Sequence, residues 1–139
     1  MHKPVSIGVH VPSVSVSGLA DGAAYAAYFK IVEDVGLDAV WVEDRIFHPA
    51  HLADSLTLLT WAAAATSRIQ LGTAVTVLNL RQAPVLARQV TTLHHLSGGR
   101  VTLGVSIGGR PEEYRALGVP MDRRVGFFRE SLDVLRRLL

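Results

Sequence analysis

Two carboxylates and two imidazoles stand close together in this chain and could carry proton or metal chemistry. Glu43 and Asp44 are adjacent, and His48 and His51 follow them, three positions apart. Imidazole and carboxylate groups are suitable ligands for zinc or iron. However, Pro49 breaks helical geometry between the two histidines, and no second cluster completes a ligand set. We therefore expect no metal site, and we interpret Asp44 and His48 as candidate catalytic residues.

The composition excludes several other kinds of chemistry. The 139 residues include no cysteine, so disulfides, thiolate metal sites and cysteine nucleophiles are ruled out. Hydrophobic residues make up 49% of the chain and charged residues 19%, which is the composition of a folded chain and not of a disordered one. A formal net charge of +2 does not supply the clustered positive charge that nucleic-acid binding requires. We expect no nucleic-acid partner.

No apolar segment has the length of a signal peptide core or a membrane span. Serine, glycine, histidine and proline interrupt the apolar stretch at 5–12. The longest helical apolar run, at 56–65, is well short of the roughly 20 residues that cross a bilayer. We therefore expect no membrane association and predict a cytoplasmic location.

Four apolar, β-branched segments are predicted to be the strands of one parallel sheet. They span 5–10, 39–43, 69–77 and 101–107. Each shows little alternation of apolar and polar residues, as expected of strands buried on both faces. Their starts lie roughly 32 residues apart, and a segment with helical periodicity separates each pair, which is typical of successive βαβ units.

The segments between the predicted strands carry the start signals of helices. Asp21 is the predicted N-cap of the first, the second is predicted to begin after Asp54-Ser55, and Pro84 fits the first turn of the third. The fourth connection is predicted to be a short helix from Pro111, followed by a longer helix that Asp122 caps. The apolar stripe of that longer helix, which a sheet must cover, consists of Val125, Phe128, Leu132, Leu135 and Leu139.

Two architectures accommodate four βα units. Eight such units would make about 256 residues, close to the roughly 250 of a (β/α)8 barrel. The alternative is a small open α/β domain that binds a nucleotide, but the G-x-G-x-x-G turn expected after its first strand is absent, and 10–13 read His-Val-Pro-Ser. We predict an α/β fold of the TIM-barrel type with only the first four βα units, a half barrel formed by a single domain over 1–139.

Several motifs, taken in order, resemble those of the bacterial luciferase-like monooxygenase family. They occupy 36–44, 71–75, 80–81, 84–87, 96–101, 104–108 and 112–118. The resemblance extends over nearly the whole chain, and it corresponds to the N-terminal half of such a protein. The Ser-Gly-Gly-Arg motif at 97–100 and the segments after it are more similar to the deazaflavin-dependent branch than to the light-emitting one.

The resemblance implies an oxidoreductase or monooxygenase that uses reduced FMN or the deazaflavin coenzyme F420 on a small organic substrate. The alternative is a non-catalytic half barrel, because four strands leave two open sheet edges. In addition, the phosphate-binding loops of barrel enzymes generally follow the seventh and eighth strands. We therefore expect either a homodimer that restores eight strands or a missing C-terminal half.

The candidate site residues follow the carboxyl ends of the predicted strands, where barrels of this type carry their chemistry. The candidate cofactor-binding residues are His10, Glu43, Asp44, Ala74, Val75, Ser106, Ile107 and Gly108. The resemblance implies that Asp44 lies beside the redox ring. It also implies a bulged third strand with a non-proline cis peptide at Ala74–Val75, whereas the residues alone are equally consistent with an ordinary buried strand.

Each candidate also has a structural interpretation. Asp44 could cap a helix or pair with Arg45, which stands where many relatives have histidine and which cannot pass protons. His10 could point into the core, and His48 could be an exposed loop residue. The segment 106–109 combines a hydroxyl with two glycines and allows close approach of a flat ring or an anion, or it is a plain strand-to-helix turn.

Overall fold

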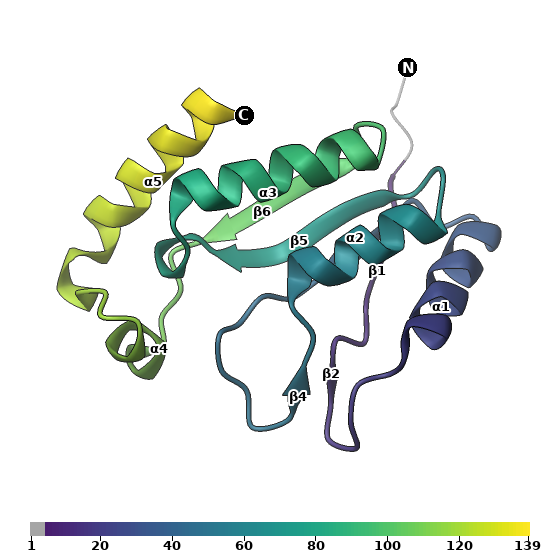
Figure 1. Cartoon of the computed structure of the whole chain (residues 1–139), viewed down its shortest axis with the longest axis horizontal. Helices are drawn as coiled ribbons and strands as arrows, with labels where there is room; N and C mark the ends of the chain where they lie inside the picture. The colour runs from purple at the N-terminus through teal and green to yellow at the C-terminus, as the bar shows by residue number, and fades with distance from the viewer. Residues whose placement is uncertain (1–4) are drawn as a thin grey trace.

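The computed structural model describes residues 5–139 and contains a four-stranded parallel sheet (Figure 1). Its strands are β1 (Gly8–His10), β3 (Ala39–Val42), β5 (Gln70–Val77) and β6 (Val101–Ser106). They are hydrogen-bonded in the order β1-β3-β5-β6, so each strand lies beside the next one in the sequence. A doubly wound sheet reverses its order at a switch point, and this sheet does not. The first four residues of the predicted domain lie outside the described part.

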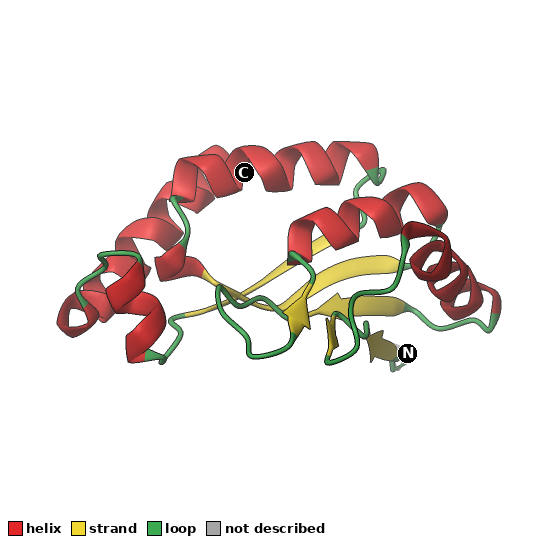
Figure 2. Cartoon of the chain, turned by 60° about the horizontal axis from the view of Figure 1, so that its bottom comes forward, coloured by secondary structure: helices red, strands yellow, loops and turns green. Residues whose placement is uncertain are grey.

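Helices connect the strands, and α2 and α3 cover one face of the sheet (Figure 2). The α-helices are α1 (Gly22–Asp34), α2 (Ser55–Ala65), α3 (Ala83–Leu96), α4 (Pro111–Ala116) and α5 (Arg124–Leu138). Two short 3-10 helices are η1 (Leu78–Leu80) and η2 (Met121–Arg123). Within residues 5–139, none of the helices is both long enough and apolar enough to cross a membrane.

A second, two-stranded antiparallel sheet was not predicted from the sequence. It pairs β2 (Val14–Ser15) with β4 (His51–Leu52), and the Ala53 N–H donates to the Ser13 carbonyl at 2.9 Å. Strands of two residues are too short to show alternation in a sequence. This sheet joins the loop after β1 to the loop after β3.

The helix starts confirm the cap predicted for α1, show a cap at Asp54 of α2, and correct the cap predicted for α5. The Asp21 carboxylate accepts the Ala24 N–H at 2.8 Å, and the Asp54 carboxylate accepts the Thr57 N–H at 2.9 Å. Asp122 is not a cap, because it lies inside η2, and α5 begins at Arg124 with no side-chain cap. An N-cap needs a non-helical backbone before the first turn, and the 3-10 turn leaves Asp122 none.

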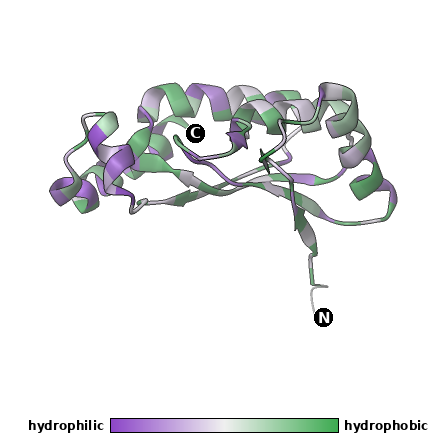
Figure 3. Ribbon diagram, turned by 90° about the horizontal axis from the view of Figure 1, so that it is seen from below, coloured by the Kyte–Doolittle hydropathy of each residue, from purple (hydrophilic) through white to green (hydrophobic). Residues whose placement is uncertain are grey.

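The hydrophobic core lies between the sheet and the helices, and both layers contain hydrophobic segments (Figure 3). Its fully buried side chains include Val40, Val42 and Leu71 from the strands and Phe29, Leu59, Leu86 and Leu93 from the helices. The predicted stripe of α5 is covered only in part. Leu135 is buried and Phe128 and Leu132 are half-buried, but Val125 and Leu139 are exposed. The reason is that α5 packs against α3 and η1 more than against the sheet.

The opposite face of the sheet carries small and polar residues around one indole ring. The strand register pairs Trp41 with His10 and Gly72, and Gly8 lies two positions before His10, beside the indole ring. A Cβ atom added to Gly72 would lie 2.2 Å from the Trp41 ring, so glycine is required for the ring to lie across β5. Trp41 is half-buried there, and no helix of the described chain covers it.

Candidate functional site

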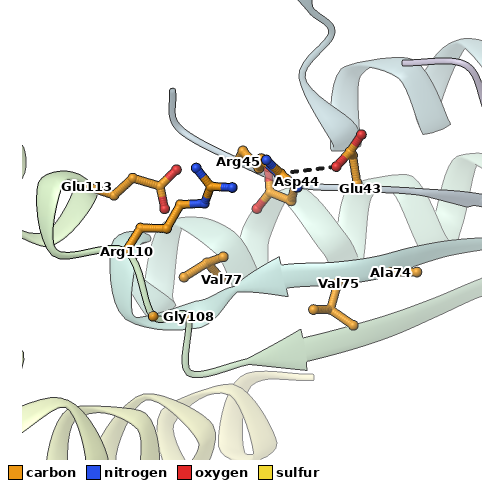
Figure 4. A pocket seen from close by; sticks show the side chains of 10 residues that line it. Glu43, Asp44, Arg45, Ala74, Val75, Val77, Gly108, Arg110 and Glu113 are labelled. Atoms are coloured by element: carbon orange, nitrogen blue, oxygen red, sulfur yellow. Dashed lines mark ion pairs between the residues drawn. The ribbon is translucent and has the colours of Figure 1, made fainter. Parts of the chain in front are cut away.

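An open hollow of about 220 Å³ lies at the carboxyl ends of β3, β5 and β6 (Figure 4). Its lining residues are Glu43, Asp44, Arg45, Ala74, Val75, Val77, Gly108, Gly109, Arg110 and Glu113. Because the strands are parallel, their carboxyl ends meet at one edge and bring these distant segments together. Five of the predicted site residues line the hollow, namely Glu43, Asp44, Ala74, Val75 and Gly108.

The wall formed by β5 has an irregular backbone. The register between β5 and β6 shifts between Thr73 and Thr76, and the Ala74–Val75 peptide bond is cis. This confirms the bulged strand and the cis peptide that the family resemblance implied. Ala74 and Val75 are exposed, so they present small apolar surface to the hollow. Gly108, which lies beside Val77, has a φ of +71° and adds no side chain to the wall.

Asp44 makes contacts that the sequence did not predict. Only 3% of its side chain is exposed. Its Oδ2 accepts the Arg81 Nε–H at 2.9 Å, and its Oδ1 accepts hydrogen bonds from Arg81 Nη2 and, at 3.1 Å, from the Ser55 hydroxyl. The proposed ion pair with Arg45 is wrong, because Arg45 Nε lies 3.2 Å from Glu43 Oε2 instead (Figure 4). Side chains two apart on extended backbone point the same way.

Arg81 connects two acids at the edge of the hollow. Its Nη2 also donates to Asp54 Oδ2 at 3.2 Å. Burial by itself would lower the pKa of Arg81, but the hydrogen bonds and charges of Asp44 and Asp54 raise it. Burial would likewise raise the pKa of Asp54, but hydrogen bonds from Thr57 and Arg81 lower it. Both groups therefore stay ionised near neutral pH.

Glu113 is a site residue that sequence reasoning missed. It is 2% exposed, and its Oε1 accepts the Ile46 N–H at 3.2 Å and the Phe47 N–H at 3.4 Å. Figure 4 shows Glu113 and Arg110 on the side of the hollow opposite Asp44 and Arg45. In the sequence, Glu113 looks like any acid in the first turn of a helix, where a negative charge is favourable because of the helix dipole. No local signal distinguishes it.

Four predicted residues do not line the hollow. His10 ends β1 and is exposed, and its carbonyl accepts the Tyr28 hydroxyl at 3.1 Å. His48 lies in the loop after β3, where its Nδ1 accepts the Ala50 N–H at 3.0 Å. Ser106 and Ile107 are half-buried just before Gly108. Across 5–139 the structure brings no three metal-ligating side chains together.

The comparisons with known proteins agree with this arrangement. Residues 5–139 match the family model of luciferase-like monooxygenases. The chain belongs to this family. The F420-dependent glucose-6-phosphate dehydrogenase of Kineococcus radiotolerans is 40% identical over 129 residues, which are 86% of this chain and 36% of that protein.

Two solved structures share the fold. An F420-dependent secondary alcohol dehydrogenase in complex with an F420-acetone adduct superposes with a TM-score of 0.78 at 25% identity, over 94% of this chain and 41% of that one. The second is the oxygenating constituent of 3,6-diketocamphane monooxygenase from Pseudomonas putida, in complex with FMN. It superposes with a TM-score of 0.86 at 18% identity, over 97% of this chain and 39% of that one. This chain therefore spans between 36% and 41% of the three proteins.

Proposed function

We propose that the chain forms the N-terminal half of a luciferase-like TIM barrel, with residues 1–139 as one domain. We further propose that its hollow holds the redox ring of FMN or F420 in an oxidoreductase or monooxygenase that acts on a small organic molecule. The hollow at the carboxyl ends of β3, β5 and β6 carries this proposal, because chemistry in TIM barrels takes place at that end. Family membership and the cofactors named for its relatives support it.

The charges around the hollow favour a ring over a phosphate group. Glu43 is paired with Arg45, Asp44 with Arg81 and Arg110 with Glu112, so each of the three arginines has an acidic partner. Two parts of the wall, Ala74–Val75 and Gly108, have small side chains or none, so a flat ring can approach the backbone there. A phosphate would need unpaired positive groups or free backbone N–H groups.

The bound cofactor would supply the hydride or oxygen chemistry, and the chain would orient its ring. The Asp44 carboxylate is held in one orientation, because both of its oxygens accept hydrogen bonds. Arg45 can donate hydrogen bonds but cannot pass a proton. The exposed Ala74 and Val75 side chains would exclude water from one face of the ring.

Ligand titration tests the ring site directly. We expect the purified chain to bind riboflavin and FMN weakly and within about twofold of each other, because the phosphate adds no contact here; each twofold is only about 0.4 kcal/mol. Ala74→Phe should fill the hollow and weaken riboflavin binding at least about tenfold. Ala64→Phe, at an exposed position on α2, is the matched control and should leave binding unchanged. Fluorescence titration measures all three, with F420 titrated in parallel.

Two results would contradict the proposal. One is equal riboflavin affinity in Ala74→Phe and the unaltered chain. The other is no binding of riboflavin, FMN or F420 at millimolar concentration.

A further inference from the structure

The loop between β3 and α2, residues 43–54, carries most of the polar groups at the edge of the hollow. An acid stands near each of its ends, since Asp44 follows β3 and Asp54 is the N-cap of α2. The two acids lie ten positions apart in the sequence, and one cation contacts both of them. Asp44 is buried, whereas 48% of the Asp54 side chain is exposed.

Arg81 is that cation. It follows η1 at the end of β5, and 16% of its side chain is exposed. Its guanidinium contacts Asp44 through both Nε and Nη2 and contacts Asp54 through Nη2. A planar guanidinium can make this two-point contact with a carboxylate, and a lysine ammonium cannot.

Other contacts of the 43–54 loop are made at 46–47 and 51–52, away from Asp44. Glu113 binds the N–H groups of Ile46 and Phe47, and the β2–β4 sheet binds His51 and Leu52. None of these contacts reaches the Asp44 carboxylate. Its orientation therefore depends on Arg81 and on the Ser55 hydroxyl, which makes a single bond.

We propose that Arg81 is a positioning residue of the site, which orients the Asp44 carboxylate at the wall of the hollow and closes the 43–54 loop at its base. The part that concerns ligand binding rests on the proposed function. Arg81 itself does not line the hollow, so it acts on a ligand only through Asp44.

Two measurements on the whole chain test this proposal. Hydrogen–deuterium exchange reports on the loop without any ligand, and riboflavin titration reports on the hollow. The variants are Arg81→Gln, Arg81→Lys, Asp54→Ser, which keeps a good N-cap, and the double variant Asp44→Glu with Arg81→Lys. Arg88→Gln, at an exposed position on α3, is the matched control.

We expect Arg81→Gln to speed amide exchange throughout 43–54 and to raise the riboflavin dissociation constant about tenfold, with exchange in β5 and α3 unchanged. For Arg81→Lys, the exchange rates in 43–54 and the riboflavin dissociation constant should lie between those of Arg81→Gln and those of the unaltered chain. The double variant should recover part of the lost affinity, because the longer acid compensates for the shorter base. Asp54→Ser should speed exchange only at 52–54 and change affinity less than about threefold, and Arg88→Gln should change neither.

Three outcomes would overturn the proposal. They are unaltered loop exchange in both Arg81 variants, an affinity loss in Asp54→Ser equal to that in Arg81→Gln, and no recovery in the double variant. Failure of the unaltered chain to bind riboflavin would count against the proposed function instead, and the exchange data would still decide the role of Arg81 in the loop. If Arg81→Gln does not fold, loop exchange and riboflavin affinity are compared between Arg81→Lys and the double variant, and this comparison tests the proposal in the same way.

Discussion

Asp44 and Arg81 are 37 positions apart in the sequence, yet each satisfies the charge of the other. A buried carboxylate is costly unless it is paired and hydrogen-bonded, and Asp44 meets both conditions. The sequence alone does not identify this partner, because β4, α2, β5 and η1 lie between the two residues. Glu113 shows the same limit, since its two N–H donors lie 66 and 67 positions away.

Glu113 gives a prediction at this scale. Glu113→Ala should lower the free energy of unfolding by about 1–3 kcal/mol, because it leaves the N–H groups of Ile46 and Phe47 without their acceptor. Glu113→Gln keeps an acceptor oxygen and should lose less than half as much. Urea denaturation of both variants measures the difference. Equal losses would show that the carboxylate charge, and not the two hydrogen bonds, stabilises the loop.

At the scale of elements, Glu33 in the last turn of α1 organises the connection from α2 to β5. Its carboxylate accepts the N–H groups of Ser67 at 3.0 Å, Arg68 at 2.7 Å and Ile69 at 3.1 Å. Burial alone would raise the pKa of Glu33, but these hydrogen bonds lower it from 4.5 to about 2. The carboxylate therefore stabilises the fold in its ionised form.

The sign of the pH dependence follows. Because the pKa of Glu33 is lower in the folded state, its contribution is complete above pH 4.5 and is lost as the pH falls toward 2. Glu33→Gln should be less stable than the unaltered chain at pH 7, and the difference should shrink through that window. Urea denaturation from pH 7 to pH 2.5 tests this. Asp34→Asn, an exposed neighbour in the same helix, is the control. A difference that stays constant with pH would contradict the assignment.

At the scale of the whole molecule, the four-stranded sheet leaves surfaces that a closed barrel would cover. The outer edges of β1 and β6 pair with no described strand, and Trp41 is half-buried on the face without helices. Unpaired edges promote association with further strands. This arrangement is consistent with the expected homodimer or missing C-terminal half, which remain proposals.

Sedimentation velocity tests the assembly. We expect the chain to form a dimer through the Trp41 face and its strand edges. Thr102→Lys places a charge on this face, since Thr102 pairs with Gly72, and should favour the monomer. Thr92→Lys, at an exposed position on α3, should not. A stable, folded monomer of the unaltered chain, or equal effects of the two lysines, would contradict this prediction.

Local patterns in the sequence determined the elements of this protein. Apolar runs specified the four strands, and Asp21, Asp54 and Pro84 marked helix starts, because periodicity and capping depend on residues a few positions apart. Only the tertiary structure decided which groups meet. The ion pair of Asp44 with Arg81 and the bonds of Glu113 to the loop after β3 exist because parallel strands bring their carboxyl ends to one edge, a spacing that no local pattern encodes.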